Sequence, residues 1–145
     1  MGDNMSYNLA IEQVSARELI AEIGGTNEDL CLYDYNLNLI VRIDGQKVGF
    51  VSLLVTADNE DDVDDTRNAM AAFWDVESGK LTLGDLIGTC AEWLWQEHEL
   101  PMEVWSARDD RERIAMLREA GFRLFRSTND PHLRCPFRFR YTGPV

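Results

Sequence analysis

The sequence predicts one α/β domain spanning residues 1–145, with a central sheet and helices on both of its faces. Three observations support this fold class. Segments with the two-residue period of strands alternate with segments that have the period of amphipathic helices. Asp44-Gly45 separates two apolar segments in the manner of a hairpin turn. The second of these segments, residues 47–57, is apolar on both faces for much of its length, as a central strand between two helix layers is.

The chain begins with a predicted strand and helix. Residues 7–14 alternate loosely between apolar and polar side chains, which indicates a first strand. Ser15 and Glu18 have the spacing of a capping box, in which each side chain accepts a hydrogen bond from a free amide at the start of a helix. Gly24-Gly25 supplies a stop for that helix.

The first hairpin is followed by an acidic segment. Residues 37–43 place apolar side chains on one face of a strand, and residues 47–57 form the return strand. Residues 58–65 contain six carboxylates, and like charges at this density predict a solvated or partner-facing loop. Calcium binding is the alternative, but this loop lacks the glycine and the closing glutamate of an EF-hand frame, so no metal site is predicted.

A strand and the longest helix come next. Residues 68–76 are predicted to be a strand. Thr82 can cap a helix with Asp85 at its third position, and apolar residues then recur at helical spacing until about Glu99. Residues 102–107 alternate as a further strand.

The C-terminal part predicts one helix and two strands. Asp109 and Asp110 favour a helix N-terminus, where the helix dipole stabilises negative charge, and Gly121 ends that helix. Residues 122–127 and 133–141 are predicted to be strands joined by a turn. The four tryptophans, Trp74, Trp93, Trp95 and Trp105, are expected in the core rather than at an interface.

The charge of the chain limits the classes of molecule that it is expected to bind. The chain has 26 acidic and 14 basic residues and a net charge of -12, which repels phosphate backbones and anionic lipid surfaces. Direct binding to nucleic acid or a membrane is therefore not expected, unless a local basic patch overrides the charge. The acidity suits a basic protein or a polyamine that contacts residues 58–65, and the other interpretation is that the charge only keeps the protein soluble.

The cysteines and the N-terminal residues indicate the cellular compartment in which the protein is expected. Cys31, Cys90 and Cys135 lack metal-ligand spacing and the density of a secreted disulfide scaffold. No apolar segment has the length of a membrane span or a signal sequence. We therefore expect reduced thiols in a cytoplasmic protein, and the sequence leaves its oligomeric state open.

The order of elements resembles that of the GNAT N-acetyltransferase superfamily. The most specific local match is the strand Val104-Trp105-Ser106-Ala107, a polar turn, the helix at residues 111–120, and Gly121-Phe122. The resemblance implies a mixed, largely antiparallel central sheet that holds acetyl-CoA between its central strands. It also implies transfer of the acetyl group to an amine.

In that family, a loop of the form Gln/Arg-x-x-Gly-x-Gly/Ala at the start of the long helix binds the pyrophosphate of the cofactor. The corresponding residues here are 79–84, in which Gly84 matches the motif and Thr82 stands where a glycine is usual. The alternatives are a phosphate site made of backbone amides and a plain helix-capping turn. The candidate cofactor-binding residues are Lys80, Leu81, Thr82, Leu83 and Gly84.

The resemblance also identifies candidate catalytic positions. Family members often place an acidic general base on the fourth strand, where Asp75 and Glu77 stand in this sequence and share a face by alternation. Leu117 occupies the position of the tyrosine that protonates the departing thiolate in many members, and Asp110 stands where an asparagine is usual. Leucine cannot donate a proton, and we expect Leu117 in the core.

Two functions follow. The first is an N-acetyltransferase that uses acetyl-CoA and a cationic or protein amine, with Asp75 or Glu77 as the base. The alternative is a catalytically inactive GNAT-like protein whose acidic surface occupies a basic surface of a partner, such as a host protein that binds nucleic acid.

Overall fold

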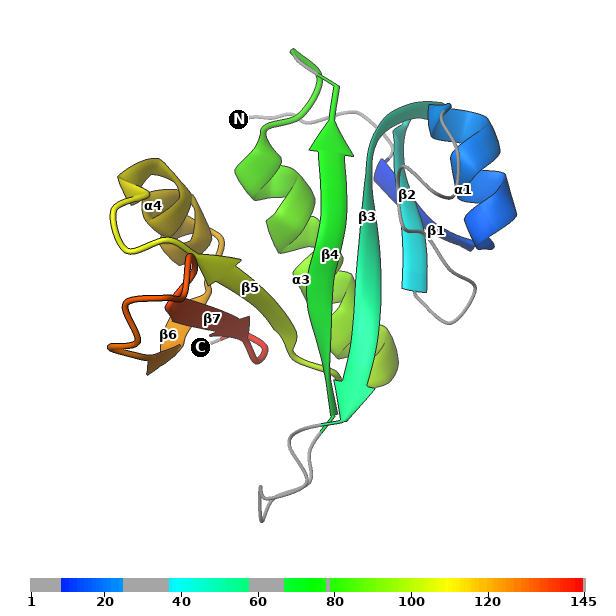
Figure 1. The fold of residues 1–145 in the computed structure, drawn as a ribbon. Coiled ribbons are helices and arrows are strands. Elements are labelled where there is room, and N and C mark those ends of the chain that lie inside the picture. The colour runs from blue at the N-terminus through cyan, green and yellow to red at the C-terminus, as the bar shows by residue number, and fades with distance from the viewer. Residues whose placement is uncertain (1–8, 25–36, 58–66, 78, 145) are drawn as a thin grey trace.

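A computed structural model defines residues 9–24, 37–57, 67–77 and 79–144 of the chain. These residues form a sheet with the strand order β1-β2-β3-β4-β5-β7-β6 (Figure 1). The strands are β1 (Leu9–Val14), β2 (Leu37–Ile43), β3 (Gln46–Ala57), β4 (Arg67–Val76), β5 (Met102–Ser106), β6 (Arg123–Ser127) and β7 (Phe137–Tyr141). The helices are α1 (Ala16–Ile23), α3 (Leu83–His98) and α4 (Arg111–Glu119). The predicted fold class and order of elements are confirmed.

The capping box at the start of α1 forms as its sequence predicts. The Ser15 hydroxyl accepts a hydrogen bond from the Glu18 amide at 3.1 Å, and the Ser15 amide donates to the Glu18 carboxylate at 3.2 Å. The helix ends at Gly24, whose φ of 79° suits a residue without a side chain.

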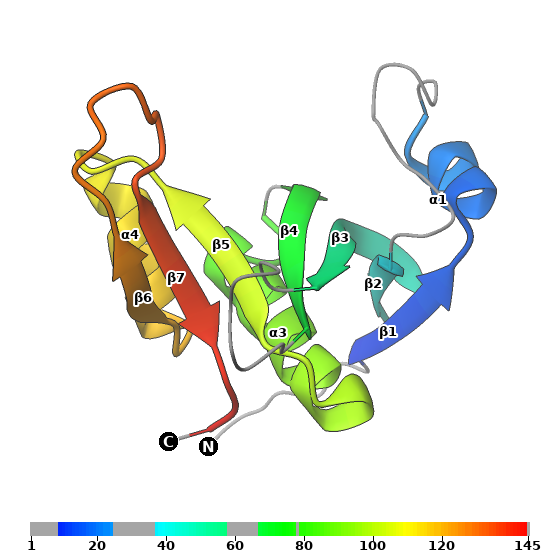
Figure 2. The same ribbon diagram turned by 60° about the horizontal axis from the view of Figure 1, so that its bottom comes forward.

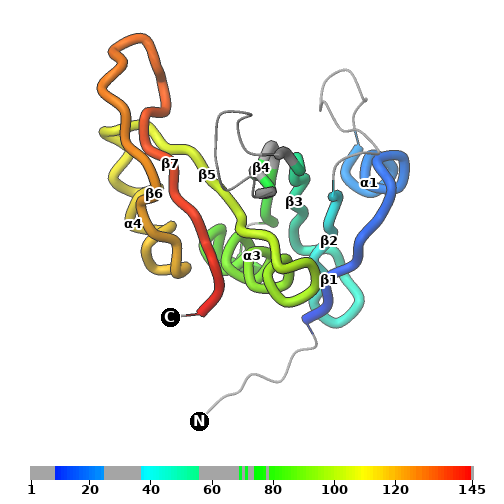
Figure 3. Tube along the Cα trace, turned by 90° about the horizontal axis from the view of Figure 1, so that it is seen from below, coloured from blue at the N-terminus to red at the C-terminus, as the bar shows by residue number. Residues whose placement is uncertain are grey.

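Alternation along β2 separates two hydrophobic clusters. Leu39 and Val41 are fully buried on the face of the sheet that α3 and α4 cover. Ile40 points to the other face, where it packs with Leu19 of α1 and Phe50 of β3. Figure 3 shows α1 near β1 and β2, whereas α4 lies beside β6 and β7. The helices therefore cover both faces, as the apolar character of residues 47–57 predicts.

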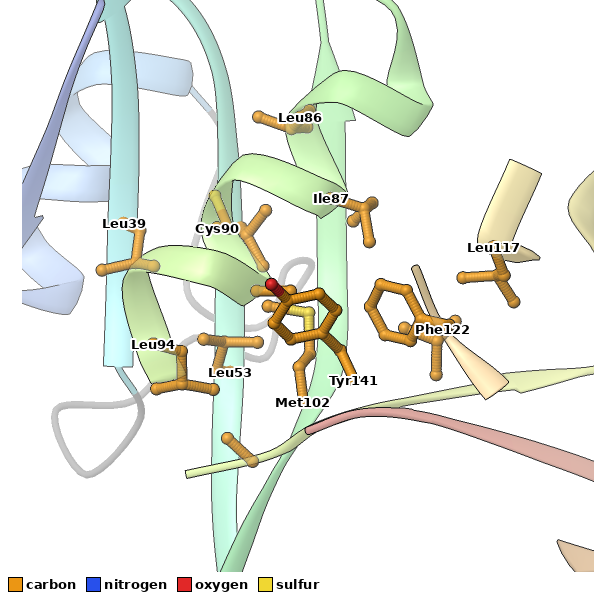
Figure 4. Close-up of a cluster of buried hydrophobic side chains, with 14 of the residues drawn as sticks. Leu39, Leu53, Leu86, Ile87, Cys90, Leu94, Met102, Leu117, Phe122 and Tyr141 are labelled. Atoms are coloured by element: carbon orange, nitrogen blue, oxygen red, sulfur yellow. The ribbon is translucent and has the colours of Figure 1, made fainter. Parts of the chain in front are cut away.

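The larger cluster joins α3 to both halves of the sheet. Figure 4 shows Leu86, Ile87, Cys90 and Leu94 of α3 among side chains from the strands, with Tyr141 at the centre of the group. At typical values, full burial of each such aliphatic side chain stabilises the fold by about 2 kcal/mol. This packing fixes where α3 begins relative to the sheet.

Two details differ from the predictions. The last strand begins at Phe137 rather than at residue 133, because Pro136 has no amide to donate and the Leu133 amide bonds to Asp130 in a turn. Trp105 is 38% exposed, so its expected place in the core is wrong. Because Val104 points into the core, alternation along β5 turns Trp105 to the outer face.

Candidate functional site

β4 and β5 separate soon after they pair. All the other neighbouring strands are antiparallel within the described part of the sheet, whereas β4 and β5 are parallel. Their register contains only Ala69 opposite Met102 and Met70 opposite Glu103. The two strands then diverge, as Figures 1 and 2 show, and α3 begins at the wide end of this divergence.

A pocket of about 490 Å³ lies at this wide end. It is within the size range of sites for small molecules and cofactors. Its lining comes from the end of β4, the first turn of α3 and the first turns of α4: Trp74, Leu83, Gly84, Asp110, Glu112, Arg113 and Met116.

The N-terminus of α3 opens into this pocket. The Thr82 hydroxyl caps the helix by accepting a hydrogen bond from the Asp85 amide at 3.1 Å. The amides of Leu83 and Gly84 belong to the first helical turn, which offers no intrahelical acceptors for them. Such amides and the helix dipole favour an anion. A Cβ on Gly84 would lie 3.2 Å from Met116 Cγ, so the close packing of α4 against the start of α3 favours glycine at this position.

Arg113 provides the positive charge of the pocket. Its guanidinium lies 4.7 Å from the centroid of the Trp74 ring, which fixes α4 against the end of β4. Asp110 caps α4 by accepting a hydrogen bond from the Arg113 amide at 3.1 Å, and this cap places the helix start beside the pocket. Sequence reasoning missed Arg113 as a site residue, although its three-residue spacing from both Asp110 and Met116 indicates a shared helix face.

Only two of the five predicted cofactor-binding residues line the pocket of about 490 Å³. Leu83 and Gly84 line the pocket. Thr82 serves as the helix cap, and Leu81 packs against the main hydrophobic cluster. Lys80 is exposed in the preceding turn, where its amide donates a hydrogen bond to the Glu77 carbonyl.

The predicted catalytic carboxylates lie together on the other face of the sheet. Asp75 is opposite Phe50, which packs against α1, whereas the preceding Trp74 faces the cofactor-sized pocket. Asp75 and Glu77 are exposed and line a second pocket of about 300 Å³, together with Lys47. The Asp75 carboxylate accepts a hydrogen bond from the Val76 amide at 2.8 Å. This arrangement brings the two candidate bases to one surface, as their spacing predicts.

Leu117 is fully buried in the main cluster, which confirms its expected place in the core. No proton donor therefore stands at the position that the resemblance assigns to the general acid.

Residues 58–65 lie outside the described part of the chain, so the predicted acidic loop has no structural account. Within the ranges that the structure defines, no three His, Cys, Asp or Glu side chains converge on a point where a metal ion could bind. None of the helices in these ranges has the length and apolar character needed to cross a membrane.

Comparisons with known proteins identify the fold. Neither a protein-family model nor a curated protein sequence matches the chain. Solved structures do match over nearly all of it. The aminoglycoside acetyltransferase AAC(6')-Ib in complex with coenzyme A has a TM-score of 0.61 at 14% identity, with 93% of this chain and 95% of that chain covered.

Two further structures give the same result. Arabidopsis thaliana NAA60 in complex with acetyl-CoA has a TM-score of 0.60 at 12% identity, with 92% of this chain and 98% of that chain covered. An acetyltransferase of the GNAT family from Streptococcus pneumoniae has a TM-score of 0.52 at 13% identity, with 94% and 100% covered. With its divergent parallel strand pair and its strand order, the chain has the fold of the GNAT superfamily.

Proposed function

We propose that this chain is an N-acetyltransferase that binds acetyl-CoA beside the N-terminus of α3 and acetylates an amine of a cationic or protein substrate. The observation that carries the proposal is the pocket of about 490 Å³ at the wide end of the β4–β5 divergence. Two structural neighbours are named as complexes with coenzyme A or acetyl-CoA.

The residues at the pocket fit an anionic cofactor in two respects. The amides of Leu83 and Gly84 and the positive end of α3 favour a phosphate group, and the Arg113 guanidinium adds a full positive charge. The carboxylates of Asp110 and Glu112 also line the pocket and oppose this attraction. Because Asp110 caps α4 through its hydrogen bond to the Arg113 amide, its carboxylate is tied to the helix rather than directed only at a ligand.

Asp75 and Glu77 are the groups that we assign to the acceptor amine. An ammonium must lose a proton before its nitrogen can attack, and an exposed carboxylate can accept that proton directly or through water. Bound acetyl-CoA would supply an acetyl thioester, whose carbon–sulfur bond would break as the carbon–nitrogen bond to the amine forms. Leu117 is buried and has no proton to donate, so water would have to protonate the departing thiolate.

The chemistry favours a positively charged acceptor. The net charge of -12 attracts cations at long range. The carboxylates of Asp75 and Glu77 add to this attraction at the second pocket, of about 300 Å³, which they line. A polyamine or a lysine-bearing protein segment has the required charge and a primary amine. In this proposal residues 58–65 contribute to the same attraction.

The second candidate function is a GNAT-like protein without catalysis that binds a basic partner. One observation favours it, namely the buried leucine at the position of the general acid. Only the acetyltransferase requires acetyl-CoA, so cofactor binding tests the first function, and acetyl transfer separates the two functions if the cofactor binds.

Calorimetric titration with acetyl-CoA tests the proposal. We expect micromolar binding that Gly84→Glu abolishes, because this change places a bulky carboxylate beside Met116 and the helix amides. Gln96→Glu is the matched control, since it adds the same charge to an exposed position near the other end of α3. Arg113→Ala should weaken the binding of acetyl-CoA. In a separate activity assay, Asp75→Asn or Glu77→Gln should lower the rate of acetyl transfer to spermidine.

Absence of binding at millimolar acetyl-CoA, in protein whose circular dichroism shows a folded chain, would eliminate the acetyltransferase. Binding without transfer to spermidine or to a lysine-rich peptide would support the second candidate. Equal loss of acetyl-CoA binding in Gly84→Glu and Gln96→Glu would show that the cofactor does not bind beside the N-terminus of α3.

A further inference from the structure

The outer face of β5, β7 and β6 carries two rows of paired side chains. The register places Glu103, Arg140 and Arg123 in one row and Trp105, Arg138 and Arg126 in the other. Directly paired residues of antiparallel strands point to the same side. Met102, Val104, Phe139 and Tyr141 point to the other side and join the core with α3 and α4. Figure 2 shows β5, β7 and β6 side by side with α4 behind them.

This face is positively charged in a strongly acidic protein. Residues 101–145 contain nine of the 14 basic residues but six of the 26 acidic residues. Glu103 is the one acidic residue in the two rows, and it is 2% exposed and bonded to both Arg138 and Arg140. Arg123 and Arg126 are exposed, and neither forms a salt bridge with any residue that the structure defines.

Two exposed aromatic rings complete the face. Trp105 is 38% exposed and Phe125 is 44% exposed. The Arg140 guanidinium lies 3.6 Å from the centroid of the Phe125 ring, and the Arg138 guanidinium lies 5.4 Å from that of Trp105. These stacked cations hold both aromatic side chains in place. Aromatic and arginine side chains of this kind are enriched at protein interfaces.

β6 also offers its backbone. It is the edge strand of the sheet, with β7 on one side, and all five of its residues are exposed. An edge strand presents main-chain donors and acceptors to which an extended peptide can add as a further strand. Arg123 and Arg126 lie on this strand, so a peptide there would bring its side chains next to two guanidinium groups.

We infer that this face, formed by Arg123, Phe125, Arg126, Trp105 and Arg138, docks an extended acidic segment of a partner protein on the β6 edge. Carboxylates of the segment pair with Arg123 and Arg126, which favour carboxylates through their planar donors. An apolar side chain of the segment packs against Phe125. This surface is separate from the pocket assigned to the cofactor and does not depend on the proposed function.

Other occupants fit this face less well. A second copy pairing β6 with β6 would bring the arginines of both strands together, and like charges across a strand pair are destabilising. A single-stranded nucleic acid binds mainly by stacking its bases on aromatic rings, and the Arg140 guanidinium, 3.6 Å from the centroid of the Phe125 ring, already occupies one face of that ring.

The test uses a fluorescent synthetic peptide of alternating Glu and Val, with a length of about ten residues, as a strand has. The matched probes are a Lys-Val peptide of the same length and a single-stranded thymidine oligonucleotide. We expect anisotropy to show saturable binding of the Glu-Val peptide alone. The double variant Arg123→Glu/Arg126→Glu should weaken it by about tenfold or more, whereas Arg111→Glu/Arg118→Glu, an equal charge change on α4, should leave it within about twofold.

Both double variants alter exposed side chains, and circular dichroism with thermal melting checks that they fold. Phe125→Ser, which keeps the charge, should also weaken peptide binding. The inference is overturned if the Glu-Val peptide does not bind, or if the two double variants lose binding equally. Tighter binding of the oligonucleotide would reassign the face to nucleic acid, and self-association that only Arg123→Glu/Arg126→Glu abolishes would reassign it to a second copy.

Discussion

The guanidinium of Arg138 donates two hydrogen bonds to the carboxylate of Glu103, from Nε and from Nη2, each 2.9 Å long. Arg140 donates a third at 3.0 Å, and the Trp105 indole N–H donates a fourth. β5 and β7 are thus joined by a charged network as well as by their backbone. The Glu103 carboxylate accepts all four of these hydrogen bonds.

Glu103→Gln should lower the free energy of unfolding by about 3 kcal/mol, because it removes the negative charge that two part-buried guanidinium groups share. Arg138 and Arg140 are 24% and 11% exposed, so water replaces only part of the lost interaction. Urea denaturation measures this change. Glu112→Gln, at an exposed position, is the control. A loss below about 1 kcal/mol, typical of a surface pair, would contradict the assigned role.

The same network predicts a pH dependence. Burial by itself would raise the pKa of Glu103, but hydrogen bonds from Arg138, Trp105 and Arg140 hold that pKa below its ordinary value. Since the folded pKa is the lower one, the stabilisation is present above the unfolded pKa of about 4.3 and is lost as pH falls through the folded pKa. The stability difference between wild type and Glu103→Gln should therefore shrink in acid. A difference that grows in acid would reverse the sign and refute the argument.

Most of the fold could be predicted from local sequence. Ser15 and Glu18, Thr82 and Asp85, and Asp44-Gly45 each act through neighbours a few residues away, so their spacing alone indicates a cap or a turn. The pairing of β7 between β5 and β6 has no such local signal. It depends on contacts between distant segments, among them those of Arg138 and Arg140 with Glu103, which is 35 and 37 residues away.

The candidate site could be predicted only in part. Gly84 and the Asp75–Glu77 pair lie where a single element places them. The role of Arg113 depends on how α4 packs against the end of β4, which tertiary contacts determine and a motif within one segment does not. For the same reason, the exposed position of Trp105 required knowledge of which face of β5 the helices cover.

Two glycines near α3 should respond in opposite ways to alanine. A Cβ on Gly49 would lie 2.9 Å from Leu86 Cδ1 and 3.0 Å from the Asp75 carbonyl oxygen, which the sheet cannot move easily. Gly49→Ala should therefore destabilise the fold by about 2 kcal/mol through overpacking. Gly88 lies inside α3, and its Cβ would meet Ala120 Cβ at 3.4 Å, an ordinary contact. Gly88→Ala should be neutral or stabilise by up to about 1 kcal/mol through helix propensity. Thermal melting of both variants tests the pair, and equal effects would count against this packing.

The cap of α3 should contribute measurably to stability. Thr82→Ala removes the hydroxyl that accepts from the Asp85 amide and should cost about 1 kcal/mol of unfolding free energy. Thr82→Ser retains the acceptor and should recover most of the loss. Chemical denaturation of the three proteins checks this order. If serine were no better than alanine, the hydrogen bond would not be the source of the effect.

Cys90 should be unreactive until the protein unfolds. Burial raises the pKa of its thiol to about 12, and the thiolate is the reactive form. Its side chain is fully buried between α3 and the sheet, so a reagent also lacks access in the folded state. Cys135 is part exposed and free, which makes it the internal comparison. A Cys31→Ser/Cys135→Ser variant, which keeps only Cys90, should resist iodoacetamide at about pH 8 while Cys31→Ser/Cys90→Ala reacts. The labelling rate of the variant that keeps only Cys90 should rise with denaturant concentration in parallel with unfolding. Rapid labelling of Cys90 in folded protein would mean that α3 separates from the sheet far more readily than its buried contacts imply.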